Sequence, residues 1–337
     1  MTARAVVVDG PGRHRLVTAP APVPGPGEVR VTVHAAGICG SDRELYDGNR
    51  PAEYVRYPVV PGHEWSGTVD AVGAGVDDTL VGRRTVAEGF RNCQVCARCR
   101  VGETSLCGAG YEETGFTLPG AFADRLVVPA RLLHPLNRDV DLTAAALLEP
   151  AAVSAAAVLT AAPRPGERAA VVGAGTLGLL AVQLLAASSP AELLVVDPRE
   201  RPARQALAMG ATRHCAPGQT PALHGRYDLV LETAGAPGTA RESCLLARRG
   251  GRVVLTGIPG PPAHGIDPAA LVTGALTVSG VFGAPSAAWT YAVQAFHAGV
   301  LRPAPLITHR LPLESFPEAV GLVGSGDPDV GKVLLLP

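Results

Sequence analysis

The sequence contains few aromatic residues and no excess of charge of either sign. Aromatic side chains make up 4% of the 337 residues, and the formal net charge is -1. Without a basic excess, the chain lacks the electrostatic means to attract nucleic acid or an anionic membrane. Hydrophobic residues nevertheless make up 47% of the chain, which is enough for sizeable cores. Because the length exceeds what one core usually organises, we expect two domains.

The chain also lacks long hydrophobic runs and the apolar core of a signal peptide. In residues 1–16, short apolar and polar stretches alternate and a Gly-Pro turn comes early, unlike the start of a secreted protein. The apolar stretch 177–187 is shorter than a membrane span and contains Gln183. We therefore expect a cytoplasmic protein with no membrane partner. In that compartment the seven cysteines are better explained as metal ligands or free thiols than as a disulfide framework.

Two patterns of secondary structure divide the chain. Up to about residue 140, short β-branched runs alternate with Gly and Pro, which predicts a folded-over sheet or small barrel. From residue 142, apolar strands alternate with helical segments, which predicts a parallel, doubly wound sheet. We expect strands at 5–8, 29–35, 67–72, 123–128, 168–173, 192–197, 228–232, 251–257 and 276–282. We expect helices at 143–159, interrupted at Glu149-Pro150, and at 176–187, 199–209 and 239–246.

These patterns imply an α/β protein with a β-rich domain at 1–145 and a nucleotide-binding domain at 146–282. A segment at 91–108 is expected to form a separate lobe of the first domain. The Pro-rich tail, 283–337, is expected to return to the first domain.

The second domain carries a dinucleotide-binding signature, G-x-G-x-x-G, between an expected strand and helix. Gly173 permits the tight turn, Gly175 lets the backbone approach a pyrophosphate, and Gly178 lets helix and strand pack closely. Thr176 and Leu177 open the helix, whose amide hydrogens and partial positive charge favour phosphates. The alternative is a glycine-rich turn that binds nothing. The order of strand, glycines, helix and acid argues against that alternative.

The acid of this signature is Asp197, which ends the second strand of the domain. Its carboxylate can accept hydrogen bonds from the adenosine ribose and repels a 2′-phosphate, so we expect NAD in preference to NADP. Arg199 and Arg201 lie close enough in sequence to weaken that preference, and NADP stays an alternative.

Four cysteines crowd into one short segment in the pattern C-x2-C-x2-C-x7-C. They are Cys93, Cys96, Cys99 and Cys107. Four thiolates at such spacing can surround one zinc ion tetrahedrally. Because a closed four-sulfur site leaves no position for substrate, this zinc is expected to be structural. Free thiols, disulfides or iron are the alternatives.

A second set of candidate ligands is spread along the chain. Cys39 and Ser41 follow an early strand, His63 and Glu64 follow a Pro-Gly turn, and Glu149 lies near the domain boundary. One Cys, one His and carboxylates are the ligand types of a catalytic zinc that keeps an open position. Each residue alone is weak evidence, because a lone buried cysteine or histidine is usually structural. Their combination carries the prediction.

In these residues the chain resembles the zinc-dependent medium-chain dehydrogenase/reductases, the superfamily of alcohol, sorbitol and threonine dehydrogenases. The motifs Cys39-Gly-Ser-Asp, Pro61-Gly-His-Glu, the four-cysteine segment, Glu149-Pro and Gly173-Ala-Gly-Thr-Leu-Gly178 occur in the family's order. The resemblance implies a GroES-like catalytic domain and a Rossmann nucleotide domain. It also implies two zinc ions per chain, one catalytic and one structural, and a homodimer or homotetramer.

The resemblance further implies roles for individual residues. Cys39, His63 and Glu149 correspond to the ligands of the catalytic zinc. Glu64 is either a fourth ligand or a group that can replace the bound water. Cys39 and His63 are therefore expected to be catalytic residues as well as metal ligands.

Proton transfer is expected to involve Ser41, which matches the hydroxyl that takes the proton from the substrate. Many members carry a His five residues after the zinc Cys, where this chain has Glu44. A carboxylate can still carry a proton to solvent, but Glu44 is equally well explained as a surface charge. By the same resemblance, Lys332 is expected to approach the pyrophosphate.

The expected reaction moves a hydride between a secondary alcohol and NAD(P), so the partner is a small alcohol or ketone. Asp42, Glu44, Glu112 and Glu113 are candidate acids that could bind several hydroxyls or an amine; solvated loops explain them equally well. Segments 57–67 and 111–116 resemble the branch that acts on polyols, sugars and aminocyclitols, such as 2-deoxy-scyllo-inosamine in antibiotic biosynthesis. A threonine-type amino-alcohol dehydrogenase and a non-catalytic, zinc-stabilised nucleotide-binding protein are the alternatives.

Overall fold

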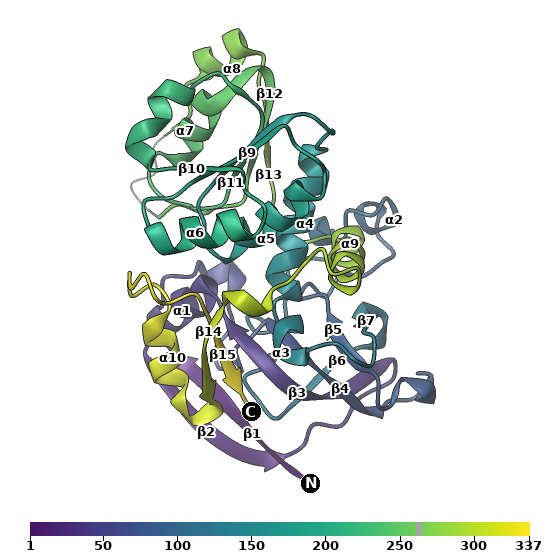
Figure 1. The fold of residues 1–337 in the computed structure, drawn as a ribbon. Coiled ribbons are helices and arrows are strands. Elements are labelled where there is room, and N and C mark those ends of the chain that lie inside the picture. Colours follow the sequence, from purple (N-terminus) through teal and green to yellow (C-terminus); the bar gives the residue numbers. More distant parts are fainter. Residues whose placement is uncertain (261–264) are drawn as a thin grey trace. The chain divides into compact units, whose positions relative to one another are not determined.

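The computed structural model describes residues 1–260 and 265–337, which form two compact units (Figure 1). Unit 1 comprises Met1–Glu149, Pro285–Val293 and Pro303–Pro337, and unit 2 comprises Pro150–Ala284 and Gln294–Arg302. The tail thus belongs mostly to unit 1, while Gln294–Arg302 groups with unit 2. In the part of the chain that is described, no helix combines the length and the apolar character that a membrane crossing needs.

Unit 1 is built on a seven-stranded sheet in the order β14-β15-β3-β4-β5-β7, with β6 also paired to β3, and on a β1-β2 hairpin. Its strands are β1 (Thr2–Gly10), β2 (Arg13–Pro20), β3 (Glu28–Ile38), β4 (Glu64–Val72), β5 (Arg84–Ala87), β6 (Arg125–Pro129), β7 (Leu133–Pro135), β14 (Ile307–Pro312) and β15 (Lys332–Leu336). Along β3, Val29, Val31 and Val33 are buried while the residues between them are not, as expected for a strand with one face on a core. The C-terminal β15 pairs antiparallel with β3.

Short helices connect these strands. The α-helices that begin in unit 1 are α1 (Gly40–Asp47), α2 (Ala97–Arg100), α3 (Leu142–Ala145), α4 (Leu148–Ala161), α9 (Ser286–His297) and α10 (Phe316–Leu322). Single 3-10 turns are η1 (Ala52–Tyr54), η2 (Asp78–Leu80), η3 (Thr104–Leu106), η4 (Ala130–Leu132), η6 (Ala304–Leu306) and η7 (Leu313–Ser315).

Unit 2 contains a six-stranded parallel sheet in the order β10-β9-β8-β11-β12-β13. Numbered along the chain, the strands of this sheet have the order 3-2-1-4-5-6, which is the order of dinucleotide-binding sheets. In such sheets the strand order reverses beside the first strand, and the dinucleotide binds at that point. Its strands are β8 (Arg168–Val172), β9 (Glu192–Val196), β10 (Arg213–Cys215), β11 (Tyr227–Glu232), β12 (Ala247–Leu255) and β13 (Thr277–Gly280). Its helices are α5 (Thr176–Ala186), α6 (Glu200–Ala208), η5 (Pro217–Leu223), α7 (Thr239–Leu246) and α8 (Pro268–Gly274). Helices α5 and α6 pack along β8, β9 and β10, and α7 packs along β11 and β12 (Figure 1).

The expected α/β architecture is confirmed. The expected interruption of the helix at 143–159 is present, but it lies at 146–147, between α3 and α4; α4 begins at Leu148 and holds Pro150 in its first turn. A proline is tolerated there, since the first amides of a helix have no partner inside it. Several observed strands were not expected from the sequence, namely β2, β5, β7, β10, β14 and β15. The shortest of them, such as β10, hold too few residues to show a periodic pattern.

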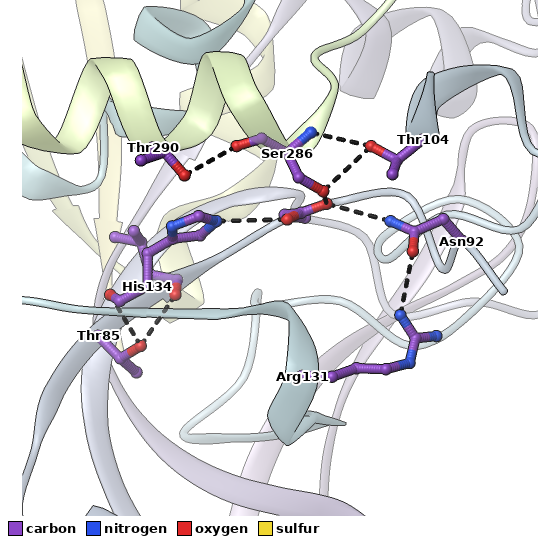
Figure 2. A network of polar contacts seen from close by, with 9 residues as sticks. Thr85, Asn92, Thr104, Arg131, His134, Ser286 and Thr290 are labelled. Atoms are coloured by element: carbon purple, nitrogen blue, oxygen red, sulfur yellow. Dashed lines mark hydrogen bonds and ion pairs between the residues drawn. The ribbon is translucent and has the colours of Figure 1, made fainter. Parts of the chain in front are cut away.

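A buried carboxylate joins several elements of unit 1 (Figure 2). Glu88 is 5% exposed, and its Oε2 accepts hydrogen bonds from Asn92 Nδ2 at 3.1 Å and Ser286 Oγ at 2.9 Å. Its Oε1 lies 3.4 Å from His134 Nε2. The amide of Ser286 in turn donates to Thr104 Oγ1 at 2.9 Å. This network therefore fixes the start of α9 to β7 and to the cysteine-rich segment.

Replacing Glu88 with Ala should destabilise the protein markedly. The change leaves the buried Nδ2 of Asn92 without its acceptor and removes one partner of the Ser286 hydroxyl, which we expect to cost about 3 kcal/mol of unfolding free energy. Urea unfolding measures this loss, with the exposed Glu53→Ala as the matched control. Equal stability of the two variants would show that the network does not hold the start of α9.

Candidate active site

The turn from β3 into α1 places the first candidate ligand. Cys39 follows β3 directly and is the N-cap residue of α1. Asp42 Oδ2 accepts a hydrogen bond from the Cys39 amide at 2.9 Å, as the acid of a capping box does. The Cys-Gly-Ser-Asp sequence therefore forms its own helix start and fixes the backbone of Cys39.

Three candidate ligands converge in unit 1. The ligand atoms of Cys39, His63 and Glu64 lie within 4.8 Å of one another. Strand pairing explains this, because Glu64 at the start of β4 is opposite Gly37 near the end of β3. His63 is 5% exposed and Glu64 is 1% exposed. One thiolate, one imidazole and one carboxylate in a buried cluster are a donor set that fits zinc.

Asp42 orients the imidazole of His63. Asp42 Oδ1 lies 3.5 Å from His63 Nδ1, and neither atom has another hydrogen-bond partner among the residues described. Burial by itself lowers the pKa of His63, but the Asp42 carboxylate outweighs it and holds that pKa well above its usual value. A carboxylate on one ring nitrogen is the usual support of a histidine that binds metal through the other.

Lys332 is a member of this cluster that the sequence did not place there. Its ammonium pairs with Glu64 Oε2, and the side chains are 5% and 1% exposed. Burial lowers the pKa of Lys332, but the charge of Glu64 reverses the effect and the pKa lies above its usual value. Lys332 is therefore paired with Glu64 in unit 1, and its expected approach to a pyrophosphate stays a prediction. The pair needs a glycine beside it, because a Cβ on Gly37 would overlap Glu64 Oε2 and come within 3.0 Å of Lys332 Cε.

The remaining expected residues lie around the cluster without joining it. Glu149 belongs to unit 1, and burial raises the pKa of its carboxyl to about 8, with the charge of Glu64 adding to the rise and that of His63 opposing it. Ser41 is half-buried on the first turn of α1. Glu44 is exposed on the same helix. The roles of these residues stay predictions.

Arg50, Tyr111 and Glu113 form a group of polar side chains, here called the polar wall, close to His63. The sequence did not predict that these residues lie together. Glu113 is 6% exposed and accepts a hydrogen bond from the Tyr111 hydroxyl, so it is not a solvated loop residue. Arg50 donates to the Tyr111 hydroxyl at 2.9 Å and lies 3.7 Å from Glu113 Oε2. Its guanidinium carbon is 3.6 Å from the centre of the Phe116 ring, and that ring is 4.7 Å from the His63 ring. No sequence pattern marks Arg50.

The four-cysteine segment forms a second cluster of thiols. The sulfurs of Cys93, Cys96, Cys99 and Cys107 lie within 4.8 Å of one another, and none forms a disulfide. The amides of Cys99 and Gly108 donate to Cys96 Sγ and lower its pKa to about 6. Amide donors that stabilise a thiolate in a four-sulfur cluster fit a closed zinc site.

The glycine signature forms the turn between β8 and α5. Gly173 has a φ of +103°, which an L side chain rarely adopts. A Cβ on Gly178 would overlap the carbonyl oxygen of Gly173, whereas a Cβ on Gly175 would meet no atom within 4 Å. Thr176 and Leu177 are the first residues of α5. Gly178 is thus required by packing, while the open space at Gly175 fits a phosphate group against the backbone.

Asp197 follows β9 and is fixed to this turn. Its Oδ2 accepts a hydrogen bond from the amide of Ala174 at 2.7 Å. Arg199 also pairs with its carboxylate. The acid therefore lies beside the glycine turn, as the sequence signature predicts.

The fold and the two thiol-containing clusters define a zinc-binding dehydrogenase, and comparisons with known proteins agree. Residues 25–138 match the alcohol dehydrogenase GroES-like domain, and residues 176–298 match the zinc-binding dehydrogenase family. L-threonine 3-dehydrogenase of Bacillus subtilis (strain 168) is 32% identical over 320 residues, which are 92% of this chain and 91% of that protein. The chain therefore belongs to the zinc-dependent medium-chain dehydrogenases and is an NAD(P)-dependent oxidoreductase.

Solved structures give the same result. A putative zinc-binding dehydrogenase from Sinorhizobium meliloti 1021 bound to NADP has a TM-score of 0.93 and 28% identity, and the match covers 100% of both chains. An alcohol dehydrogenase (rspB) from E. coli CFT073 complexed with NADH has a TM-score of 0.92 and 26% identity, and the match covers 100% of this chain and 99% of that one.

Replacing Asp42 with Ala should weaken metal binding at one cluster only. Loss of the carboxylate on His63 Nδ1 is expected to lower zinc affinity there roughly 10–100-fold, while the four-cysteine cluster keeps its zinc. Competition against a chromophoric chelator measures both affinities. Cys96→Ser is the reciprocal variant, and a loss of zinc from both clusters in Asp42→Ala would contradict the assignment.

Two glycine variants should separate packing from nucleotide binding. Gly178→Ala forces α5 away from the turn and should cost about 1–3 kcal/mol of unfolding free energy. Gly175→Ala should leave stability nearly unchanged but weaken binding of NAD and NADP, because its methyl group fills the space beside the backbone. Thermal unfolding and nucleotide titration measure the two effects. If Gly175→Ala binds nucleotide as the unchanged chain does, the phosphates do not bind at this turn.

Proposed function

We propose that this protein transfers a hydride between a secondary alcohol and NAD(P), with a polyol, sugar or aminocyclitol such as 2-deoxy-scyllo-inosamine as the alcohol. In the oxidative direction the alcohol loses a hydride to the nicotinamide and a proton to the protein, and a ketone is formed. The observation that carries the proposal is the buried Cys39–His63–Glu64 cluster, supported by Asp42 and Lys332.

The chain offers two sets of zinc ligands with different roles. Cys39, His63 and Glu149 would hold the catalytic ion, with Glu64 or water in the remaining position. The four cysteines of residues 93–107 would hold the structural ion. When bound at the first set, zinc supplies Lewis acidity toward an alcohol or carbonyl oxygen, and the nicotinamide supplies the two-electron redox chemistry.

The protein's own residues then bind, orient and move a proton. Asp42 holds the Nδ1 proton of His63, so that the other ring nitrogen stays free as a ligand. Ser41 takes the proton of the substrate hydroxyl, and the exposed Glu44 passes it to solvent. Lys332 balances the charge of Glu64 when that carboxylate is not a ligand, which would otherwise be an unpaired ion in a buried site.

The polar wall beside His63 supports a substrate with several polar groups. Arg50, Tyr111 and Glu113 bring a cation, a hydroxyl and an acid close to the cluster. These three residues bond to one another, so a substrate would have to exchange for those contacts; further hydroxyls or an amine offer the donors and acceptors to do so, and a simple alcohol does not. Segment 111–116, which together with 57–67 resembles the polyol and aminocyclitol branch, supplies Tyr111 and Glu113.

A threonine-type amino-alcohol dehydrogenase is the second candidate, favoured by the similarity to the Bacillus subtilis threonine dehydrogenase. A non-catalytic, zinc-stabilised nucleotide-binding protein is a weaker alternative, because such a protein has no need for the Cys39–His63–Glu64 cluster. We further propose a cytoplasmic homodimer or homotetramer, in which β13, an edge strand of its sheet, could pair across subunits.

The proposal predicts turnover by zinc-replete protein in a panel of polyols, aminocyclitols, threonine and simple alcohols, each with NAD and with NADP. Absorbance of the reduced cofactor measures the reaction. We expect turnover of a polyol or aminocyclitol, lost in Cys39→Ser because a zinc ligand is missing. Ser41→Ala should lower kcat roughly 10²–10⁴-fold by removing the proton acceptor, whereas the exposed Ser325→Ala should not.

The outcomes separate the alternatives. Turnover of threonine alone would favour the hypothesis of a threonine-type amino-alcohol dehydrogenase. A protein that holds zinc only at the four-cysteine cluster and turns over no member of the panel would contradict the enzyme proposal.

A further inference from the structure

The Asp197 carboxylate is covered by the side chain of a neighbouring residue. Arg199 donates to Asp197 Oδ1 through its amide and its Nε, each at 2.9 Å, and to Oδ2 through a terminal guanidinium nitrogen at 2.9 Å. Together with the amide of Ala174 at 2.7 Å on Oδ2, four donors bind this one carboxylate. The contact is the paired geometry in which guanidinium and carboxylate match best.

These four donors use the hydrogen-bonding capacity of the acid. A carboxylate has about four lone-pair sites on its two oxygens. With two donors on each oxygen of Asp197, none is left for the hydroxyls of a ribose. A ribose diol can therefore bind to the acid only if the guanidinium of Arg199 moves away from it.

The pairing with Arg199 also changes the charge that a nucleotide would meet at the end of β9. The side chain of Asp197 is 3% exposed, whereas that of Arg199 is 41% exposed. Burial alone would raise the pKa of Asp197, but the hydrogen bonds from Arg199 and from the Ala174 amide lower it below the usual range. The acid is thus an ion neutralised by Arg199, and the accessible group is a guanidinium. The expected preference for NAD assumed a free carboxylate.

We propose that Arg199 determines the choice of cofactor, so that this protein accepts the 2′-phosphorylated nucleotide, NADP, at least as well as NAD. The proposal rests on the proposed assignment of the Gly173–Gly178 turn as the dinucleotide site. A 2′-phosphate carries nearly two negative charges at neutral pH, and Asp197 would repel it if left uncovered. Arg199 removes that repulsion and supplies guanidinium donors for the phosphate oxygens.

Calorimetric binding of two cofactor fragments to the full, zinc-replete protein tests the proposal without catalysis. Adenosine 2′,5′-bisphosphate carries the distinguishing phosphate, and 5′-AMP lacks it. The unchanged protein should bind the bisphosphate at least as tightly as 5′-AMP. Arg199→Leu should weaken bisphosphate binding by about tenfold or more without weakening 5′-AMP binding, because the uncovered Asp197 then meets the ribose directly.

Two further variants complete the test. Arg199→Lys keeps one charge but loses the paired geometry, so its affinity for the bisphosphate should lie between those of the unchanged protein and Arg199→Leu. Arg204→Ala is the matched control, because this exposed arginine pairs with Glu200 on α6 and should leave the ratio of the two affinities unchanged.

The proposal is overturned if the unchanged protein prefers 5′-AMP, or if Arg199→Leu shifts both affinities equally. Binding of neither fragment would overturn it together with the assignment of the glycine turn. Binding with the expected ratio, but no turnover of any alcohol, would support cofactor selection by Arg199 while refuting the proposed reaction.

Discussion

Three neighbouring strands bring ionisable groups into the buried part of unit 1, and the rest of the site depends on balancing their charge. β3 leads to Cys39, β4 begins with Glu64, and β15 begins with Lys332. The order β15-β3-β4 places them side by side, although Lys332 comes from the C-terminal end of the chain. An unpaired ion in such an interior is costly. Each charged group therefore needs a partner.

The observed partners explain why the cluster suits a divalent cation. Asp42 supports His63, and Lys332 pairs with Glu64. A bound zinc would meet the donor atoms of Cys39, His63 and Glu64 together, because these lie within 4.8 Å of one another. The same principle recurs in unit 2, where Arg199 covers Asp197. In both units a buried acid is paired with a basic residue, which limits what else can approach that acid.

Much of this arrangement could be predicted from the sequence because its signals are local. The glycine signature and the four-cysteine spacing each lie within a short segment, and each strand and helix expected in unit 2 lies within a few residues of an observed one. Asp197 was also placed beside the glycine turn, because the signature includes its spacing.

The features that the sequence did not reveal have a common physical cause. They depend on contacts between residues that are distant in the chain, or on the direction in which a side chain points. The pairing of Lys332 with Glu64 was not expected, because it follows from the order of the strands, which local patterns do not reveal. Arg50 carries no motif, and Glu113 reads as a loop acid until its burial is known. The covering of Asp197 by Arg199 is a matter of side-chain direction that sequence spacing leaves open.

Anomalous diffraction at the zinc absorption edge, from crystals of the purified protein, would locate each bound zinc ion. We expect two peaks per chain, one among Cys93, Cys96, Cys99 and Cys107, and one in contact with Cys39 and His63. A single peak at the four cysteines, in crystals grown with excess zinc, would contradict the claim that Cys39 and His63 form a catalytic metal site.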